Sequence, residues 1–298
     1  MFTGKKFDIE HALSMYATGF VLMPAFGIYE EEIVAQFKPR IASCHIYLIG
    51  TLPAVEAVDQ RLENGKLVIG LLVGGTRHEL AWPMPSGTKL VETDQGWFVE
   101  KDGGYWAPSD EEMMRRLSNQ QDAICFEVLY VGQAYGKDGS RNALDRLLKH
   151  ETLQKISVKG IPADRRLTLL LLEIEPGNRL ITFMNPWAAN KIEGEKRIAA
   201  GLDKLFDTSD AERVTLYEAS FIRYFQPPFN KEFKDSFPST NLKVLADCYD
   251  KDFSALVSEI CIDELPFKLI STTVAPAQYH CAKFDLHDDE ARQVFFSR

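Results

Sequence analysis

The pattern of hydrophobic and polar positions predicts a chain in which strands and helices alternate. Runs rich in β-branched, aromatic or leucine residues and bounded by turn residues are typical of strands, and apolar residues at helical spacing indicate helices. The expected strands are 45–50, 124–131, 166–174 and 180–184. The expected helices are 8–16, 30–37, 109–117, 142–156, 188–206 and 212–225.

Residues 53–122 have a pattern of their own, with short apolar runs and dense turn signals. It predicts a short helix at 55–62 and then strands near 67–73, 80–82, 90–92 and 97–100. Trp82, Trp97 and Trp106 could stack on bases, but a small β core is the favoured interpretation. The segment is therefore expected to be a small β-rich insertion.

The order of elements between 124 and 230 is strand, helix, strand, strand, helix, helix, which predicts an α/β (α+β) fold with a small sheet flanked by helices. We expect an N-terminal helical segment at 1–44 and a central domain at 45–241 that contains the insertion at about 53–122. A C-terminal α/β extension at 242–298 follows, with strands and one or two short helices.

The composition is ordinary for a globular protein, with 45% hydrophobic and 26% charged residues in 298. No apolar run approaches the roughly 20 residues of a membrane helix, and the N-terminus does not resemble a signal peptide. The five cysteines are odd in number and include no C-x-x-C pair, which argues against a disulfide framework or a thiolate zinc site. The expected location is the cytoplasm.

The net charge of −9 is unevenly distributed. Residues 131–241 contain 17 Lys and Arg against 15 Asp and Glu, so this segment carries +2 and the remainder carries −11. Because phosphate binding rewards basic residues, the distribution permits nucleic-acid binding in the central segment.

Three polar motifs follow one another in this central segment. Tyr130-Val131-Gly132 stands at the end of a predicted strand. Arg146 precedes His150 by four residues, so the two share a face of the predicted helix. Glu218 lies in the last helix of the segment, and Pro227-Pro228 ends that helix just before Asn230.

These residue types suit phosphodiester hydrolysis. An arginine can donate two parallel hydrogen bonds to a phosphate, and a histidine can accept or relay a proton near neutral pH. A lone carboxylate at Glu218 suits one Mg²⁺ that keeps several waters. The Tyr130 phenol could activate or orient the attacking water, Gly132 allows a close backbone approach, and Asn230 could fix the glutamate region through backbone hydrogen bonds.

Together the motifs resemble the active site of GIY-YIG endonucleases, and the Arg-x-x-x-His spacing is closest to the restriction-enzyme-like branch. The resemblance covers about a third of the chain. It implies a hydrolase that cuts phosphodiester bonds with Mg²⁺ or Mn²⁺ bound at Glu218. DNA is favoured over RNA, and the expected partner is double-stranded DNA, cut by a homodimer in restriction or defence. The catalytic set that it implies is Tyr47, Tyr130, Arg146, His150, Glu218 and Asn230, with nucleic-acid contacts from Gly132, Arg141 and Lys149.

The first family motif is missing from its usual place, a short hairpin before Tyr130. Tyr47 in the strand 45–50 is the favoured replacement, with the insertion then lying between the two motif strands, and Tyr105 is the alternative. A literal Gly27-Ile28-Tyr29 is interpreted as a coincidence, because acidic residues typical of a helix start follow it. Arg141 is an alternative to Arg146.

Two other functions remain open. One is a non-catalytic module that keeps the scaffold to bind nucleic acid or protein, and the other is an RNA-directed nuclease.

Overall fold

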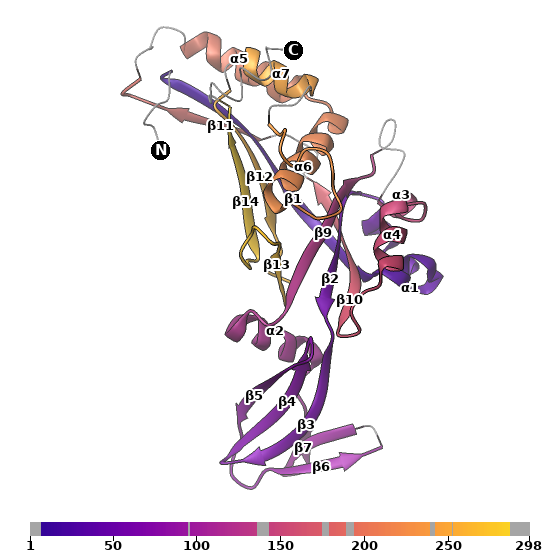
Figure 1. The fold of residues 1–298 in the computed structure, drawn as a ribbon. Helices are drawn as coiled ribbons and strands as arrows, with labels where there is room; N and C mark the ends of the chain where they lie inside the picture. Colours follow the sequence, from indigo (N-terminus) through magenta and orange to yellow (C-terminus); the bar gives the residue numbers. More distant parts are fainter. Residues whose placement is uncertain are drawn as a thin grey trace.

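The computed structural model describes residues 7–286 except for 95, 136–142, 175–178, 189–193, 239–241 and 252. The described chain is a mixed α/β fold built on one curled sheet of eight strands with flanking helices, which confirms the predicted fold class (Figure 1). The strands in spatial order are β13 (Lys268–Ile270), β9 (Cys125–Gln133), β2 (Cys44–Pro53), β10 (Arg165–Ile174), β1 (Ile9–Pro24), β12 (Ala255–Cys261) and β14 (Tyr279–Asp285), and β11 (Arg179–Met184) also pairs with β1.

Helices cover both faces of this sheet, which explains why its central strands are apolar at nearly every position. Leu169 to Leu172 of β10 are fully buried, and successive residues enter two different hydrophobic cores. The 3₁₀ helix η1 (Ala25–Tyr29), α1 (Glu31–Ile41), α3 (Ala143–Leu147) and α4 (Glu151–Lys159) belong to one core. Helices α6 (Asp210–Phe225) and α7 (Lys243–Asp250) belong to the other, and α5 (Gly194–Asp207) contacts β1 and β11.

The predicted N-terminal helix at 8–16 is wrong, because this segment is the first half of β1. That half pairs with β11 and β12, and the second half pairs with β10. Every residue from Ile9 to Met15 is buried. Periodicity cannot separate a strand that is buried on both faces from a buried helix, and so the apolar spacing misled the prediction. The predicted helix at 30–37 is confirmed as α1.

The insertion is β-rich, as predicted, and forms a lobe at the end of the molecule opposite α5 and α7 (Figure 1). It contains two three-stranded sheets and one helix, namely β3 (Val55–Glu63), β4 (Lys66–Val73), β5 (Thr76–Pro83), β6 (Lys89–Thr93), β7 (Gly96–Lys101), β8 (Gly104–Trp106) and α2 (Asp110–Gln121). The predicted helix at 55–62 is wrong. Asn64 and Gly65, both with positive φ, turn this segment back onto β4 as a hairpin.

The C-terminal segment was expected as an extension, but β12, β13 and β14 are strands of the main sheet. β13 runs parallel to β9 and covers only its first half, from Cys125 to Glu127. The second half of β9 has no strand partner on the β13 edge. There β9 contacts α6 and the loop that follows α6. Among the described residues no helix is long and apolar enough to cross a membrane.

Candidate active site

Two tyrosines lie side by side on neighbouring strands of the main sheet. Antiparallel pairing of β2 with β9 sets Tyr47 opposite Gly132 and Ile49 opposite Tyr130. The tyrosine rings stack with their centroids 6.2 Å apart. A methyl group at Gly132 would lie 2.5 Å from Cζ and Oη of Tyr47 and 2.7 Å from Cε1 of Tyr130. The packing of the two rings therefore requires a glycine at position 132. Gly132 was predicted to contact nucleic acid, but the two tyrosine rings occupy the space beside it.

His150 lies edge-on to both tyrosine rings, with ring centroids 5.5 Å from Tyr47 and 5.0 Å from Tyr130. It is the N-cap of α4, where its Nδ1 accepts a hydrogen bond from the Leu153 backbone N–H at 3.2 Å. This acceptor role requires the proton to be on Nε2, and Nε2 has no hydrogen-bond partner among the described residues. His150 therefore offers an N–H donor to the space beside the tyrosines.

The structure corrects two expectations about this segment. The single helix predicted at 142–156 is two helices, because the backbone turns between α3 and α4 at residues 148–150. Burial and the nearby Arg146 charge lower the pKa of His150 to about 4, so the imidazole is neutral at pH 7. The proton relay near neutral pH that the sequence suggested is thus disfavoured in this conformation.

Arg146 lies in α3, near enough to Tyr47 for its guanidinium to oppose the rise that burial causes in the pKa of that phenol. No ion pair engages its guanidinium within the part of the chain that the structure describes. An arginine that is not held in an ion pair keeps most of its donors for an anion. Arg141, the rival arginine, lies outside the described residues. Lys149 is exposed in the turn between α3 and α4.

Glu218 enters the same site from α6, on the opposite side of β9. It is partly buried, and the backbone and side chain of Gln133 stabilise its ionised carboxylate and so oppose part of the effect of burial on its pKa. Gln133 also contacts Thr215, one turn earlier on α6, at 3.4 Å. Burial raises the pKa of Glu218 to about 8, with Glu232 adding repulsion. Gln133 and Glu232 were not predicted as site residues, although Gln133 directly follows the Tyr-Val-Gly motif.

Asn230 ties the end of α6 to β9 through backbone hydrogen bonds. The Val131 N–H donates to Asn230 Oδ1 at 2.9 Å, and Asn230 Nδ2 donates to the Val131 carbonyl at 2.8 Å. The Phe229 N–H adds a bond to the Leu129 carbonyl at 3.1 Å. Asn230 acts here as the fixing residue that the sequence predicted, since it binds the strand between Tyr130 and Gly132.

Burial also raises the pKa of both tyrosines, and each carries a smaller repulsive contribution from Glu218. Both phenols are therefore protonated near neutral pH. In this state they can orient a water or a phosphate oxygen by hydrogen bonding. Their deprotonation would require additional positive charge nearby.

Tyr105, the alternative to Tyr47, does not reach this site. It lies in β8 of the insertion, where it is exposed and packs edge-on against Phe98. Trp82 is buried beneath Trp106 and Arg116, as expected for a small β core. Gly27 to Tyr29 form most of η1, outside the sheet.

The residues present fit a single hard cation that keeps its waters. Glu218 supplies one carboxylate, and one or two carboxylates with substrate oxygens suffice for Mg²⁺. No group of three or more His, Cys, Asp or Glu side chains able to hold a metal is found within the described ranges. A metal here would thus depend on Glu218, water and the substrate.

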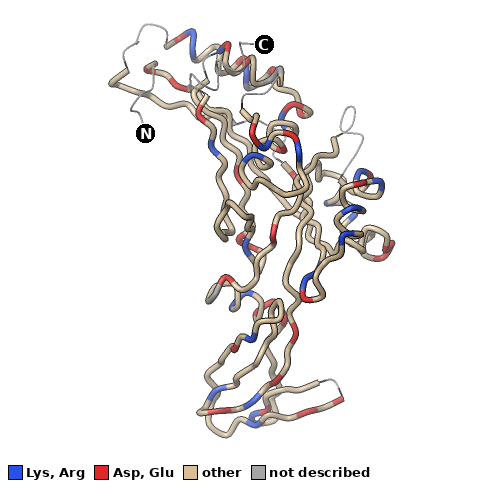
Figure 2. The backbone as a smooth tube through the Cα atoms, viewed as in Figure 1, with Lys and Arg blue, Asp and Glu red and all other residues tan. Residues whose placement is uncertain are grey.

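Five polar side chains from β2, β9, α3, α6 and the N-cap of α4 converge at one end of β9, and we call them the tyrosine site: Tyr47, Tyr130, Arg146, His150 and Glu218. The segment 143–167, which includes α3 and α4, contains six Lys and Arg against three Asp and Glu (Figure 2). No protein-family model matches this chain, and the searches of curated proteins and of solved structures found no match either.

Proposed function

We propose that the tyrosine site is the active site of a metal-dependent endonuclease of the GIY-YIG type, acting on DNA in preference to RNA. The observation that carries the proposal is the convergence of five side chains that the sequence separates by up to 171 positions, from Tyr47 to Glu218. They supply an anion-binding guanidinium, two phenols, an imidazole N–H donor and one carboxylate.

Arg146 would bind the scissile phosphate, because no ion pair engages its guanidinium among the described residues, although the nearby Glu218 carboxylate interacts with its charge. Tyr47 and Tyr130 would orient the attacking water by hydrogen bonding, and the Nε2–H of His150 would donate to a phosphate or phenol oxygen. Glu218 would hold Mg²⁺ or Mn²⁺, which when bound neutralises charge on the phosphate and its leaving oxygen. Cutting both strands of a duplex by one such site per chain favours a homodimer.

Cleavage of supercoiled plasmid DNA tests this function. The wild-type chain, Glu218→Ala and the control Glu111→Ala would be incubated with Mg²⁺ or Mn²⁺, and nicked and linear products measured. Glu111 is an exposed glutamate on α2 of the insertion, so it controls for the loss of a helical carboxylate. We expect metal-dependent cleavage by the wild type and the control, and none by Glu218→Ala. Equal cleavage by all three would contradict the proposal.

A second candidate function has one observation in its favour. With its pKa raised to about 8, Glu218 is mostly protonated at pH 7 before any metal binds, and a protonated carboxyl is a poor ligand. This favours a module that binds nucleic acid or protein without cutting it. No cleavage of DNA or RNA by the wild type in either metal between pH 7 and pH 9, with binding retained, would select this alternative.

A further inference from the structure

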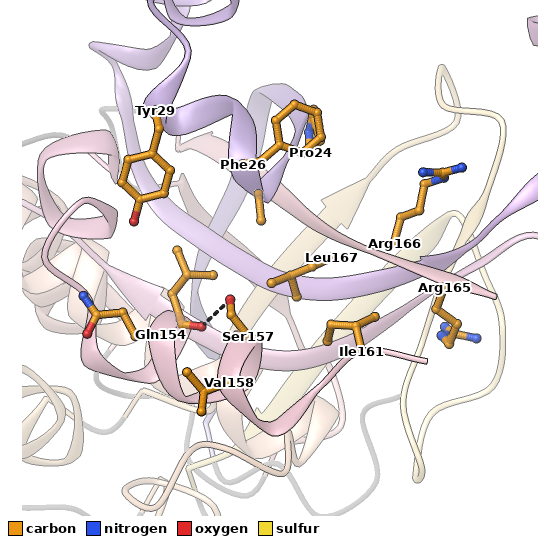
Figure 3. A pocket seen from close by; sticks show the side chains of 12 residues that line it. Pro24, Phe26, Tyr29, Gln154, Ser157, Val158, Ile161, Arg165, Arg166 and Leu167 are labelled. Carbon is orange, nitrogen blue, oxygen red and sulfur yellow. Dashed lines mark hydrogen bonds between the residues drawn. The ribbon is translucent and has the colours of Figure 1, made fainter. Parts of the chain in front are cut away.

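A groove with a volume of about 690 Å³ runs beside α4, between η1 and the start of β10 (Figure 3). Its lining is mostly apolar, and its two aromatic residues are strongly exposed: Phe26 is 64% exposed and Tyr29 is 61% exposed. Val158 on α4 is 86% exposed. Large apolar side chains gathered around one hollow on the surface are a feature of binding sites.

The charged residues that line the groove are both arginines. None of the residues that line it is acidic, and Arg165 and Arg166 lie at one end, with Tyr29 and Gln154 at the other (Figure 3). Arg165 is engaged by Thr51 and Glu127. Arg166 is exposed, and its side chain has no ion pair or hydrogen bond with any described residue. The groove therefore presents aromatic rings together with a guanidinium that is available to an anion.

The groove and the tyrosine site share the helix α4. His150 caps this helix, and Leu153, whose N–H binds His150, also lines the groove. Ser157 and Val158 lie two turns farther, about 10–12 Å from His150 along the helix. This is the length of a few stacked nucleotides, so a strand held at the tyrosine site has the groove within reach.

We infer that this groove binds nucleotides of the substrate strand next to the scissile phosphate where the duplex is opened or ends, so that these nucleotides are unpaired. Phe26 and Tyr29 would stack on the bases, and Arg166 would bind a phosphate. Paired bases stack on one another and do not present their faces to a protein groove, so the apolar lining selects a single strand or an unpaired end. The inference rests on the proposed function in taking nucleic acid as the substrate.

Fluorescence anisotropy would measure binding of the full chain to a labelled 12-nucleotide poly(dT) and to a labelled blunt duplex, without divalent metal. The test variants are Phe26→Ala/Tyr29→Ala and Arg166→Glu. The matched control is Tyr105→Ala/Trp106→Ala, which removes two exposed aromatic side chains from the insertion. Circular dichroism would verify that every variant is folded, as expected for exposed side chains.

The groove variants are expected to bind poly(dT) at least tenfold more weakly than the wild type, with duplex binding changed less than twofold in the aromatic variant. The control should bind both as the wild type does. Unchanged poly(dT) binding in the groove variants, an equal loss for both nucleic acids, or no poly(dT) binding by the wild type would overturn the inference. The last result would assign the groove to a non-nucleic-acid occupant such as an acidic peptide.

The two proposals can fail separately. Plasmid cleavage that depends on Glu218, with poly(dT) binding indifferent to Phe26 and Tyr29, would overturn the groove alone. Groove-dependent binding of poly(dT) without cleavage at any pH would overturn the nuclease alone.

Discussion

Two clusters of nearly the same residue types occupy different parts of the sheet, and their hydrogen bonding separates them. The first is the tyrosine site. The second, which we call the β1 cluster, consists of Glu10, His11, Thr182 and Arg197 where β1 meets β11 and α5. Both contain an arginine, a histidine and a glutamate next to aromatic rings.

In the β1 cluster the polar atoms bind one another and the backbone. His11 uses both ring nitrogens, with Nδ1 3.0 Å from Thr182 Oγ1 and Nε2 2.8 Å from the Arg197 carbonyl. Arg197 binds the Ile9 carbonyl and pairs with Glu10, while its guanidinium stacks on Phe7. In the tyrosine site, by contrast, Arg146 has no ion pair and His150 Nε2 has no partner among the described residues. The same residue types thus build structure in one place and leave donors for a ligand in the other.

The largest expected effect is a loss of folding stability when the β1 cluster is broken. Arg197→Ala should destabilise the fold by about 3–5 kcal/mol, because it leaves Glu10 buried without its cation. Urea unfolding at pH 7 measures the loss. The exposed Arg166→Ala is the control and should change stability by less than about 0.5 kcal/mol. If Arg197→Ala instead kept its stability and lost cleavage, the β1 cluster would be functional and the comparison would break down.

Gly132→Ala tests whether the tyrosine pair must pack as it does. The added methyl group would clash with both rings, so we expect overpacking of about 1–3 kcal/mol and at least a tenfold loss of cleavage per folded molecule. Gly104→Ala is the matched control, because the nearest atom to its added methyl group would be 3.4 Å away. Cleavage by Gly132→Ala at the wild-type rate would mean that the observed ring arrangement is not needed for activity.

Asn230→Ala is expected to affect both the stability of the fold and the geometry of the tyrosine site. It removes two hydrogen bonds from Val131 in the second half of β9, and the buried backbone groups left unpaired should cost about 1–3 kcal/mol of stability. Since this strand carries Tyr130 and Gln133, cleavage should fall as well. Thermal unfolding and plasmid cleavage would be measured on the same preparations. A loss of stability alone would show that Asn230 has no part in positioning the site.

The sequence indicated which side chains lie close together better than it predicted the individual helices and strands around them. Tyr130, Arg146, His150 and Glu218 were identified from motifs of a few residues each, and Tyr47 from its strand context, and the structure brings these five together. Such motifs are local, because each is fixed by the end of one strand or by one turn of helix.

The wrong predictions arose where tertiary contacts override local pattern. The first half of β1 has apolar residues at positions that suit a buried helix and a doubly buried strand equally. The segment 55–62 became a strand because the Asn64-Gly65 turn pairs it with β4. The lowered pKa of His150 could not be predicted from local sequence either. It depends on burial against residues distant in the sequence, such as Tyr47, more than a hundred positions away.

Cleavage should depend on pH through Glu218. Its pKa is raised to about 8 by burial, and metal must displace the proton. At subsaturating Mg²⁺ the rate should therefore rise about tenfold per pH unit below pH 8 and level off above it. Saturating metal should shift this rise to lower pH, because binding stabilises the ionised carboxylate. A rate that is flat between pH 6 and pH 8 at low Mg²⁺ would show that Glu218 does not titrate as inferred.

The smallest expected effect concerns stability in the absence of metal. The unfolded chain ionises Glu218 near its ordinary pKa of 4.5, whereas the folded chain holds the proton until about pH 8. Raising the pH between these values thus favours unfolding, and stability falls until about pH 8 and then levels off. Because Glu218 is partly exposed, we expect only about 1–2 kcal/mol of this loss between pH 6 and pH 9.

Glu218→Gln removes the titrating proton and should lose less stability over the same interval. Urea unfolding at both pH values, for the wild type and for Glu218→Gln, measures the difference. The corresponding change in the β1 cluster, Glu10→Gln, should instead destabilise the fold at both pH values because it breaks the ion pair with Arg197. Identical pH dependence in the wild type and Glu218→Gln would mean that the carboxyl is not held protonated by burial. The tyrosine site would then resemble the β1 cluster in having its charge already satisfied by the fold.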